Sequence, residues 1–111
     1  HRLEGVYMEV SKKDWKLFRT CIGGWQEAYM ERLTKEYIDL LSGDENASDK
    51  FWKLEERIKK DKKHPGVMLE LSKENMIFDI VALINRDVIT VADLKNFSDE
   101  LKEYVNYLLH R

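Results

Sequence analysis

Residues 12–42 carry one uninterrupted apolar stripe, and its length constrains the fold more than any other feature of the sequence. Apolar side chains recur every three or four residues from Trp15 to Leu41, which is the spacing of one face of an α-helix. A helix of about 31 residues spans roughly 46 Å, whereas a compact domain of this length is only about 35 Å across. The helix must therefore bend around its core, or extend beyond it and pack on something else, most simply a second copy.

Polar and turn residues mark where this helix and the next one begin and end. Ser11 and Asp14 have the spacing of a capping box at the start of the long helix, and Gly43 is expected to end it in a left-handed conformation. Ser48 is expected to cap a second helix. That helix is expected to turn three apolar residues inward: Phe51, Leu54 and Ile58.

The remaining chain is also predicted to be helical. A third helix is expected within residues 66–85, and the alternating stretch 67–71 is assigned to it because a lone strand has no partner. Thr90 and Asp93 predict a short helix over residues 91–96, and Ser98 is expected to cap the last helix. The fold class is therefore all-α, an antiparallel bundle of four to five helices organised around the long N-terminal helix (about 12–42).

The chain is predicted to hold a single helical domain over residues 8–111. Its length is that of one ordinary domain and leaves no room for two independent cores. Residues 1–7 precede Met8 and are interpreted as a cloning remnant or an upstream extension.

Two adjacent glycines interrupt the long helix, and each costs about 1 kcal/mol relative to alanine. Gly23 and Gly24 both lie outside the apolar stripe, but Gly24 belongs to a second row with Leu17, Cys21 and Ala28. Small side chains in such a row allow another backbone to approach closely. We therefore expect this row to be a self-association face and the protein to be a homodimer.

Aromatic residues are numerous for so small a core. The chain has three tryptophans, five tyrosines and four phenylalanines. Trp52 and Tyr107 fall beside the inward stripes rather than within them. Exposed Trp and Tyr often anchor protein interfaces, so these two residues are predicted to contact a partner.

Charge argues against a general affinity for polyanions. The net charge of −2 comes from 19 basic and 21 acidic residues, which gives no overall attraction to nucleic acid or to an anionic membrane. Only the segment 57–64 is locally basic, with no aromatic residue interleaved to stack on a base. It provides the alternative of a nucleic-acid-binding regulator that uses five cations: Arg57, Lys59, Lys60, Lys62 and Lys63.

No catalytic, cofactor or metal site is predicted. The three histidines lie near the two ends of the chain and at a helix end, without the spacing of zinc ligands. Cys21 is expected to be an inert, partly buried thiol. No stretch approaches the roughly 20 apolar residues of a membrane span, and no signal peptide is visible, so we expect a cytoplasmic, non-enzymatic protein.

The chain resembles a family of small bacterial helical proteins without an established function. The stretches that carry the resemblance are "KKDWKLF", "GWQEAYM", "FWKLEERI", "KHPGV" and "DLKNFSDELKE". Members are sometimes labelled "multidrug transporter", a label that the hydropathy of this chain contradicts. The resemblance implies a compact helical domain that starts near Met8, and it implies no catalytic residues.

Together these features predict a protein–protein interaction module that self-associates. A homodimer is expected, and a further protein partner is possible. Membrane association is not expected, and nucleic-acid binding through residues 57–64 remains the alternative.

Overall fold

The computed structural model describes residues 8–111, and within this range the chain is helical without any strand. It forms four α-helices and one 3-10 helix, in the order α1 (Lys12–Leu41), α2 (Ala47–Asp61), α3 (Met76–Asn85), η1 (Val91–Leu94) and α4 (Asp99–His110). The predicted all-α class and the long N-terminal helix are confirmed. The interpretation of residues 1–7 lies outside the described residues.

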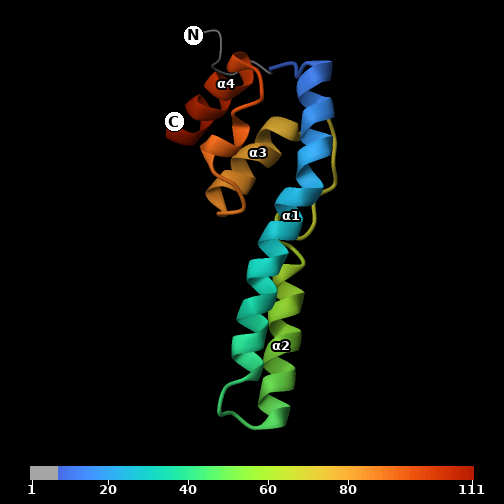
Figure 1. The fold of residues 1–111 in the computed structure, drawn as a ribbon, viewed down its shortest axis with the longest axis vertical. Coiled ribbons are helices and arrows are strands. Elements are labelled where there is room, and N and C mark those ends of the chain that lie inside the picture. Colours follow the sequence, from blue (N-terminus) through green and yellow to red (C-terminus); the bar gives the residue numbers. More distant parts are fainter. Residues whose placement is uncertain (1–7) are drawn as a thin grey trace.

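The molecule has two regions joined by α1 (Figure 1). The head contains the N-terminal half of α1 together with α3, η1 and α4, and the arm is a helical hairpin of the C-terminal half of α1 and α2, residues 30–62. The molecule measures 57 × 26 × 22 Å, with a radius of gyration of 17.2 Å. A compact domain of this length would have about 13 Å, so the arm extends well beyond the core.

The core lies in the head. Phe18 and Ile22 of α1 are buried there among apolar side chains of α3, η1 and α4. Asp14 is also buried and accepts hydrogen bonds from Ser98 N (3.0 Å) and Ser98 Oγ (2.5 Å). Since Ser98 is itself the N-cap of α4, this carboxylate ties the start of α1 to the start of α4.

The arm is far less buried. Its hairpin reverses at residues 42–46, and none of the residues of α2, all of which are described, is buried. Leu54 is half-buried, but Phe51 and Ile58 are 61% and 41% exposed. The prediction that they face inward is wrong, because the overhanging half of α1 is a narrow surface that covers only one side of α2.

Several helix ends also differ from the predictions. Asn46, rather than Ser48, caps α2, since its side chain accepts from Asp49 N at 2.9 Å. The long helix ends at Leu41 with Ser42 as its C-cap, and Gly43 is not in the left-handed region. Residues 67–71 are neither helix nor strand. Beyond the end of α2, the backbone runs back along α1 before α3 begins (Figure 1).

The expected caps at three other sites are confirmed. Ser11 Oγ accepts from Asp14 N at 3.1 Å, and Ser98 Oγ accepts from Leu101 N at 3.2 Å. Thr90 and Asp93 form the expected capping box, although the element that follows is a 3-10 helix ending at Leu94. Local side-chain chemistry therefore identified these helix starts correctly.

α1 passes through the glycine pair as one continuous helix. A Cβ atom on Gly23 or Gly24 would have no described atom of another element within 4 Å. Gly24 therefore makes no close helix–helix contact within residues 8–111, and the overhanging half of α1 packs on α2.

A tight neck joins the arm to the head. The Tyr29 and His64 rings stack at 4.4 Å, and Gln26 Nε2 donates to the Pro65 carbonyl at 3.0 Å. Gly66 is buried against Tyr29, where an added Cβ would lie only 2.4 Å from the ring. Gly66 N also donates to His64 Nδ1 at 3.0 Å. Desolvation, and then the charge of Arg86, lowers the pKa of His64, which suits an unprotonated Nδ1.

Candidate functional site

One flank of the arm, which we call the closed flank, is bridged by polar contacts beside a hollow that Leu40, Lys53 and Lys60 line. Arg57 Nη2 donates to Glu36 Oε1 at 3.1 Å, and Arg57 Nε lies 3.5 Å from Asp61 Oδ2. Tyr37 Oη donates to the same Asp61 oxygen at 2.5 Å. Burial, together with this bond to Asp61, raises the pKa of Tyr37 to about 12. These side chains partner one another across the two helices.

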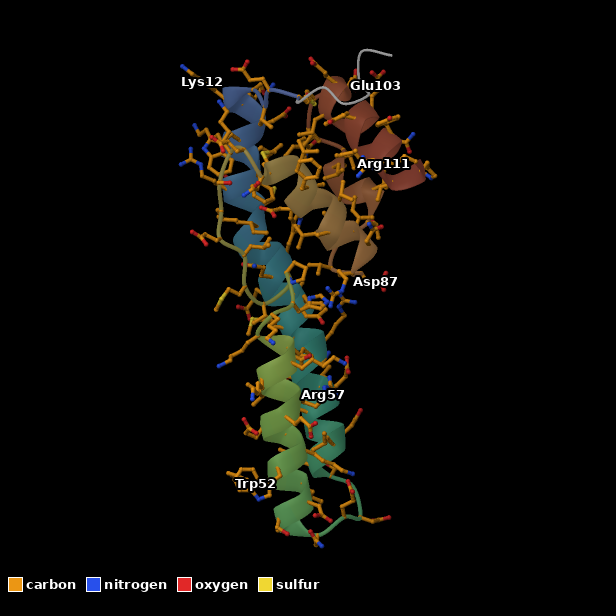
Figure 2. The ribbon with its side chains drawn as sticks, turned by 180° about the vertical axis from the view of Figure 1, so that it is seen from behind. Lys12, Trp52, Arg57, Asp87, Glu103 and Arg111 are labelled. Atoms are coloured by element: carbon orange, nitrogen blue, oxygen red, sulfur yellow. The ribbon has the colours of Figure 1, made fainter. Side chains whose placement is uncertain are left out.

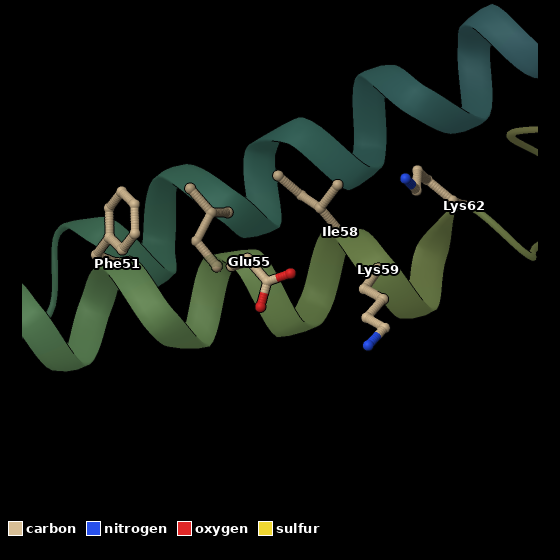
Figure 3. Close-up of a pocket in the computed structure, with 6 residues that line it drawn as sticks. Phe51, Glu55, Ile58, Lys59 and Lys62 are labelled. Atoms are coloured by element: carbon tan, nitrogen blue, oxygen red, sulfur yellow. The ribbon is translucent and has the colours of Figure 1, made fainter.

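The other flank of α2 is apolar. Phe51, Leu54 and Ile58 follow one another at three- and four-residue steps and line a groove with Glu55, Lys59 and Lys62. Figure 3 shows Phe51 and Ile58 rising from the same side of α2, whereas Lys59 points away. A ring and two aliphatic side chains thus form a row along the hairpin.

Helix geometry places apolar residues of α1 on this same flank. Each residue turns 100° around a helix, so Glu36 lies about 60° to one side of the buried Leu33, while Met30 and Leu41 lie roughly 60–80° to the other. On α2, Arg57 lies about 60° to one side of Leu54, and the apolar row lies on the other. In an antiparallel pair of helices, residues that are rotated by the same angle and in the same sense from the line of contact lie on the same flank of the pair. Glu36 and Arg57, each about 60° from that line, contact one another accordingly.

The open flank therefore carries apolar side chains of both helices, and we call these the arm face. It includes large side chains that are exposed, among them Ile38 at 62%. The arm face consists of Met30, Ile38, Leu41, Phe51, Leu54 and Ile58. Large exposed apolar patches on soluble proteins often mark interaction sites.

The predicted small-residue row lies elsewhere on α1. Leu17 and Cys21 are half-buried, with Leu17 packed against the head core, and Gly24 and Ala28 are exposed. At its C-terminal end, Ala28 lines a hollow between α1 and the segment after α3, together with Val88 and Ile89. Its role as a self-association face remains a prediction about a second copy.

The two predicted partner-contact aromatics differ. Trp52 is 63% exposed and projects outward near the tip of the arm (Figure 2), with its ring edge-on to Phe51 at 5.0 Å. Tyr107 is half-buried on α4, packs on the head core and stacks on Tyr104 at 6.3 Å. Trp52 adjoins the arm face, and Tyr107 belongs to the head.

The basic segment is divided between the two flanks of the arm. Arg57 is held by Glu36 and Asp61 on the closed flank, where Lys60 also lies. Lys59 and Lys62 border the arm face. Lys63 follows α2 and is exposed. The structure therefore does not gather the five cations into one surface, and nucleic-acid binding remains untested.

The remaining candidates for chemistry in residues 8–111 are metal-ligating side chains and the Cys21 thiol. Among these residues there is no group of three His, Cys, Asp or Glu side chains that could hold a metal ion. Burial raises the pKa of the Cys21 thiol, which disfavours the reactive thiolate. No helix in the described part of the chain is both long and apolar enough to cross a membrane.

Comparison of the chain with protein-family models, with curated proteins and with solved structures gives no match. The resemblance described above therefore stays a prediction.

The arm face was missed by the sequence reasoning, although a signal for it existed. The overhang of the long helix was expected, and the stripe Phe51, Leu54 and Ile58 was identified. A second helix that packs only on an overhang has too little partner surface to cover a wide apolar stripe. Combining these two observations would have predicted that part of the stripe is exposed.

Proposed function

We propose that this protein is a non-enzymatic interaction module that self-associates, and that the arm face is its binding surface. The observation that carries the proposal is the unburied apolar flank of the arm, where Phe51 and Ile58 lie exposed beside Ile38. Covering such an apolar stripe with another surface lowers the free energy by roughly 25 cal/mol for each Å² of apolar area removed from water.

The position of the arm favours binding over a purely structural role. The arm projects from the head (Figure 1), and Arg57 is already paired with Glu36 and Asp61 on its closed flank. Trp52 at the rim supplies a large aromatic side chain of the kind that dominates binding energy at protein interfaces.

Light scattering after size exclusion at about 100 μM tests the proposal. We expect the wild type to have the mass of two chains, and a Phe51→Glu, Ile58→Glu variant to have the mass of one. The matched control is Phe78→Glu, which changes a residue of α3 that is 52% exposed and lies outside the arm face. A monomeric wild type, or a dimeric double variant, would contradict the proposal.

A further inference from the structure

We infer that two copies of the chain pair their arm faces side by side, with base beside base and tip beside tip, about a twofold axis parallel to the arms. The inference rests on the proposed function and adds the geometry of the partner. Each arm is then half of a four-helix bundle in which neighbouring helices are antiparallel. A twofold axis uses the same surface on both copies, as an exposed self-complementary face requires.

Charged residues border the arm face on both helices, and they differ in sign. Glu27 and Glu31 are exposed on α1 near the base of the arm. They lie one turn apart and about 60–100° around the helix from Met30, toward the outer edge of the face. Lys59 and Lys62 line the groove at the base of α2. At the base of the arm one edge of the face is thus acidic and the other basic, whereas Glu55 lines the groove about one turn nearer the tip.

These border charges have no ion-pair partner among residues 8–111, unlike several charges on the closed flank. There Arg57 contacts Glu36 and Asp61, and nearer the tip Lys53 contacts Glu45. The arm thus pairs part of its charge on the closed flank, where Glu56 and Lys60 still have no ion-pair partner among the described residues. The four border charges of the arm face all lack one.

The parallel twofold axis brings the two edges together. It places α1 of one copy beside α2 of the other, at the same distance from the base. The Tyr29–His64 stack and the Glu36–Arg57 bond set the level of the two helices within the hairpin, and they put Glu31 level with Lys62. Each acidic edge then lies along the partner's basic edge, and the contact occurs twice.

Steric room on this side of α1 is consistent with the arrangement. Gly23, which continues the line of Met30 toward the head, is exposed, and a Cβ there would meet no described atom within 4 Å. The head packs on α1 through Phe18 and Ile22 instead. These residues lie more than about 80° around the helix from Gly23 and Met30.

The reversed arrangement, with the tip of one arm at the base of the other, lacks this complementarity. It places Glu31 and the partner's Lys62 about one arm length apart. The residues that meet the base edges would then come from the tip, where Ile38 and Trp52 lie. Complementary charge at an interface fixes register and orientation more than it adds affinity, so the border charges select between the two arrangements.

Charge reversal tests the geometry. We would compare a Lys59→Glu, Lys62→Glu variant and a Glu27→Lys, Glu31→Lys variant by sedimentation velocity at about 50 mM salt, where screening is weak. Each variant alone should self-associate roughly 100-fold more weakly than the wild type, because like charges replace opposite charges at both copies of the contact between the edges. An equimolar mixture should regain dimers, since all-acidic and all-basic arms then meet.

The matched control is Lys60→Glu, Lys63→Glu, which changes the net charge equally at residues away from the arm face, and it should dimerise like the wild type. Reversal variants that dimerise as tightly as the wild type, or monomeric variants whose mixture stays monomeric, would overturn the base-to-base geometry while the proposed function stands. A monomeric wild type would instead overturn the proposed function.

Discussion

The head and the arm share α1 but bury it differently. In the head, α1 places Phe18 and Ile22 within a core to which α3, η1 and α4 also contribute. In the arm the same helix meets only α2, and Leu33 is its one buried residue among residues 30–41. Most helical stability in proteins comes from packing an apolar face rather than from propensity.

The difference teaches that one helix can contribute buried side chains to a core at one end and carry exposed apolar side chains at the other. The head buries its apolar core side chains within one chain. The arm has the Glu36–Arg57–Asp61 contacts and the neck, and its arm face is exposed in the single chain. Regions with few buried apolar contacts open at lower free energy than the core does.

The largest expected effect comes from comparing the same substitution, Phe to Ala, in the two regions. Phe18→Ala in the head should lower the free energy of unfolding by about 3–5 kcal/mol, because it empties a fully buried site. Phe51→Ala in the arm, measured at about 1 μM, where association is weak, should change it by less than about 0.5 kcal/mol. Urea denaturation followed by circular dichroism measures both. Equal losses would contradict the comparison.

A second substitution breaks the neck. Gly66→Ala would place a Cβ 2.4 Å from the Tyr29 ring, so that the ring or the backbone of residue 66 must shift. We expect a loss of about 1–3 kcal/mol from overpacking, with greater mobility of the arm relative to the head. Thermal unfolding measures the loss, and an unchanged midpoint would show that the ring can move without cost.

The head holds one buried carboxylate whose removal should stabilise it. Asp79 Oδ2 is buried without a hydrogen-bond partner among the described residues, and burial raises the pKa of Asp79 to about 6. A raised pKa means that the folded state binds the proton more tightly, so stability falls as the pH rises from about 4 to 6. Because water screens this half-buried residue, we expect Asp79→Asn to gain only about 1 kcal/mol at pH 7.

The gain from Asp79→Asn should shrink as the pH is lowered from 6 to 4, since the wild-type carboxyl is then protonated in both states. Denaturation series at pH 4, 5, 6 and 7 would follow it. A gain that does not depend on pH would assign the effect to packing rather than to charge.

The smallest effects concern the glycine pair between the two regions. Gly23→Ala and Gly24→Ala should each raise the free energy of unfolding by about 0.5–1 kcal/mol, because both positions are helical and have room for a Cβ. Gly24→Leu should also fold normally and keep the wild-type mass. A Gly24→Leu variant that loses self-association would instead move the interface to the row of Leu17, Cys21 and Ala28.

The sequence was sufficient for the features that depend on neighbouring residues. The apolar period predicted α1 to within one residue at its C-terminal end, and Ser11, Ser98 and the Thr90–Asp93 pair marked helix starts through their own side chains. Asn46 and Ser48 are both good caps within one polar loop, so composition alone does not choose between them.

Features set by distant contacts could not be predicted in this way. Periodicity shows that Phe51 and Ile58 share a face, but not whether another element covers it. Gly66 is required by the Tyr29 ring, 37 positions away in the chain. The small-residue row identified a possible contact, yet small side chains alone do not specify a neighbour. The exposure of Trp52 was predicted because it falls outside the stripe of its own helix.

Hydrogen exchange at two protein concentrations tests the central claim most directly. If a second copy covers the arm face, amide hydrogens of α2 should exchange much more slowly at about 100 μM protein than at about 1 μM. Amide hydrogens of α4 in the head should exchange at the same rate at both concentrations. Protection of α2 that does not depend on concentration would contradict the account, because the arm would then be complete within one chain.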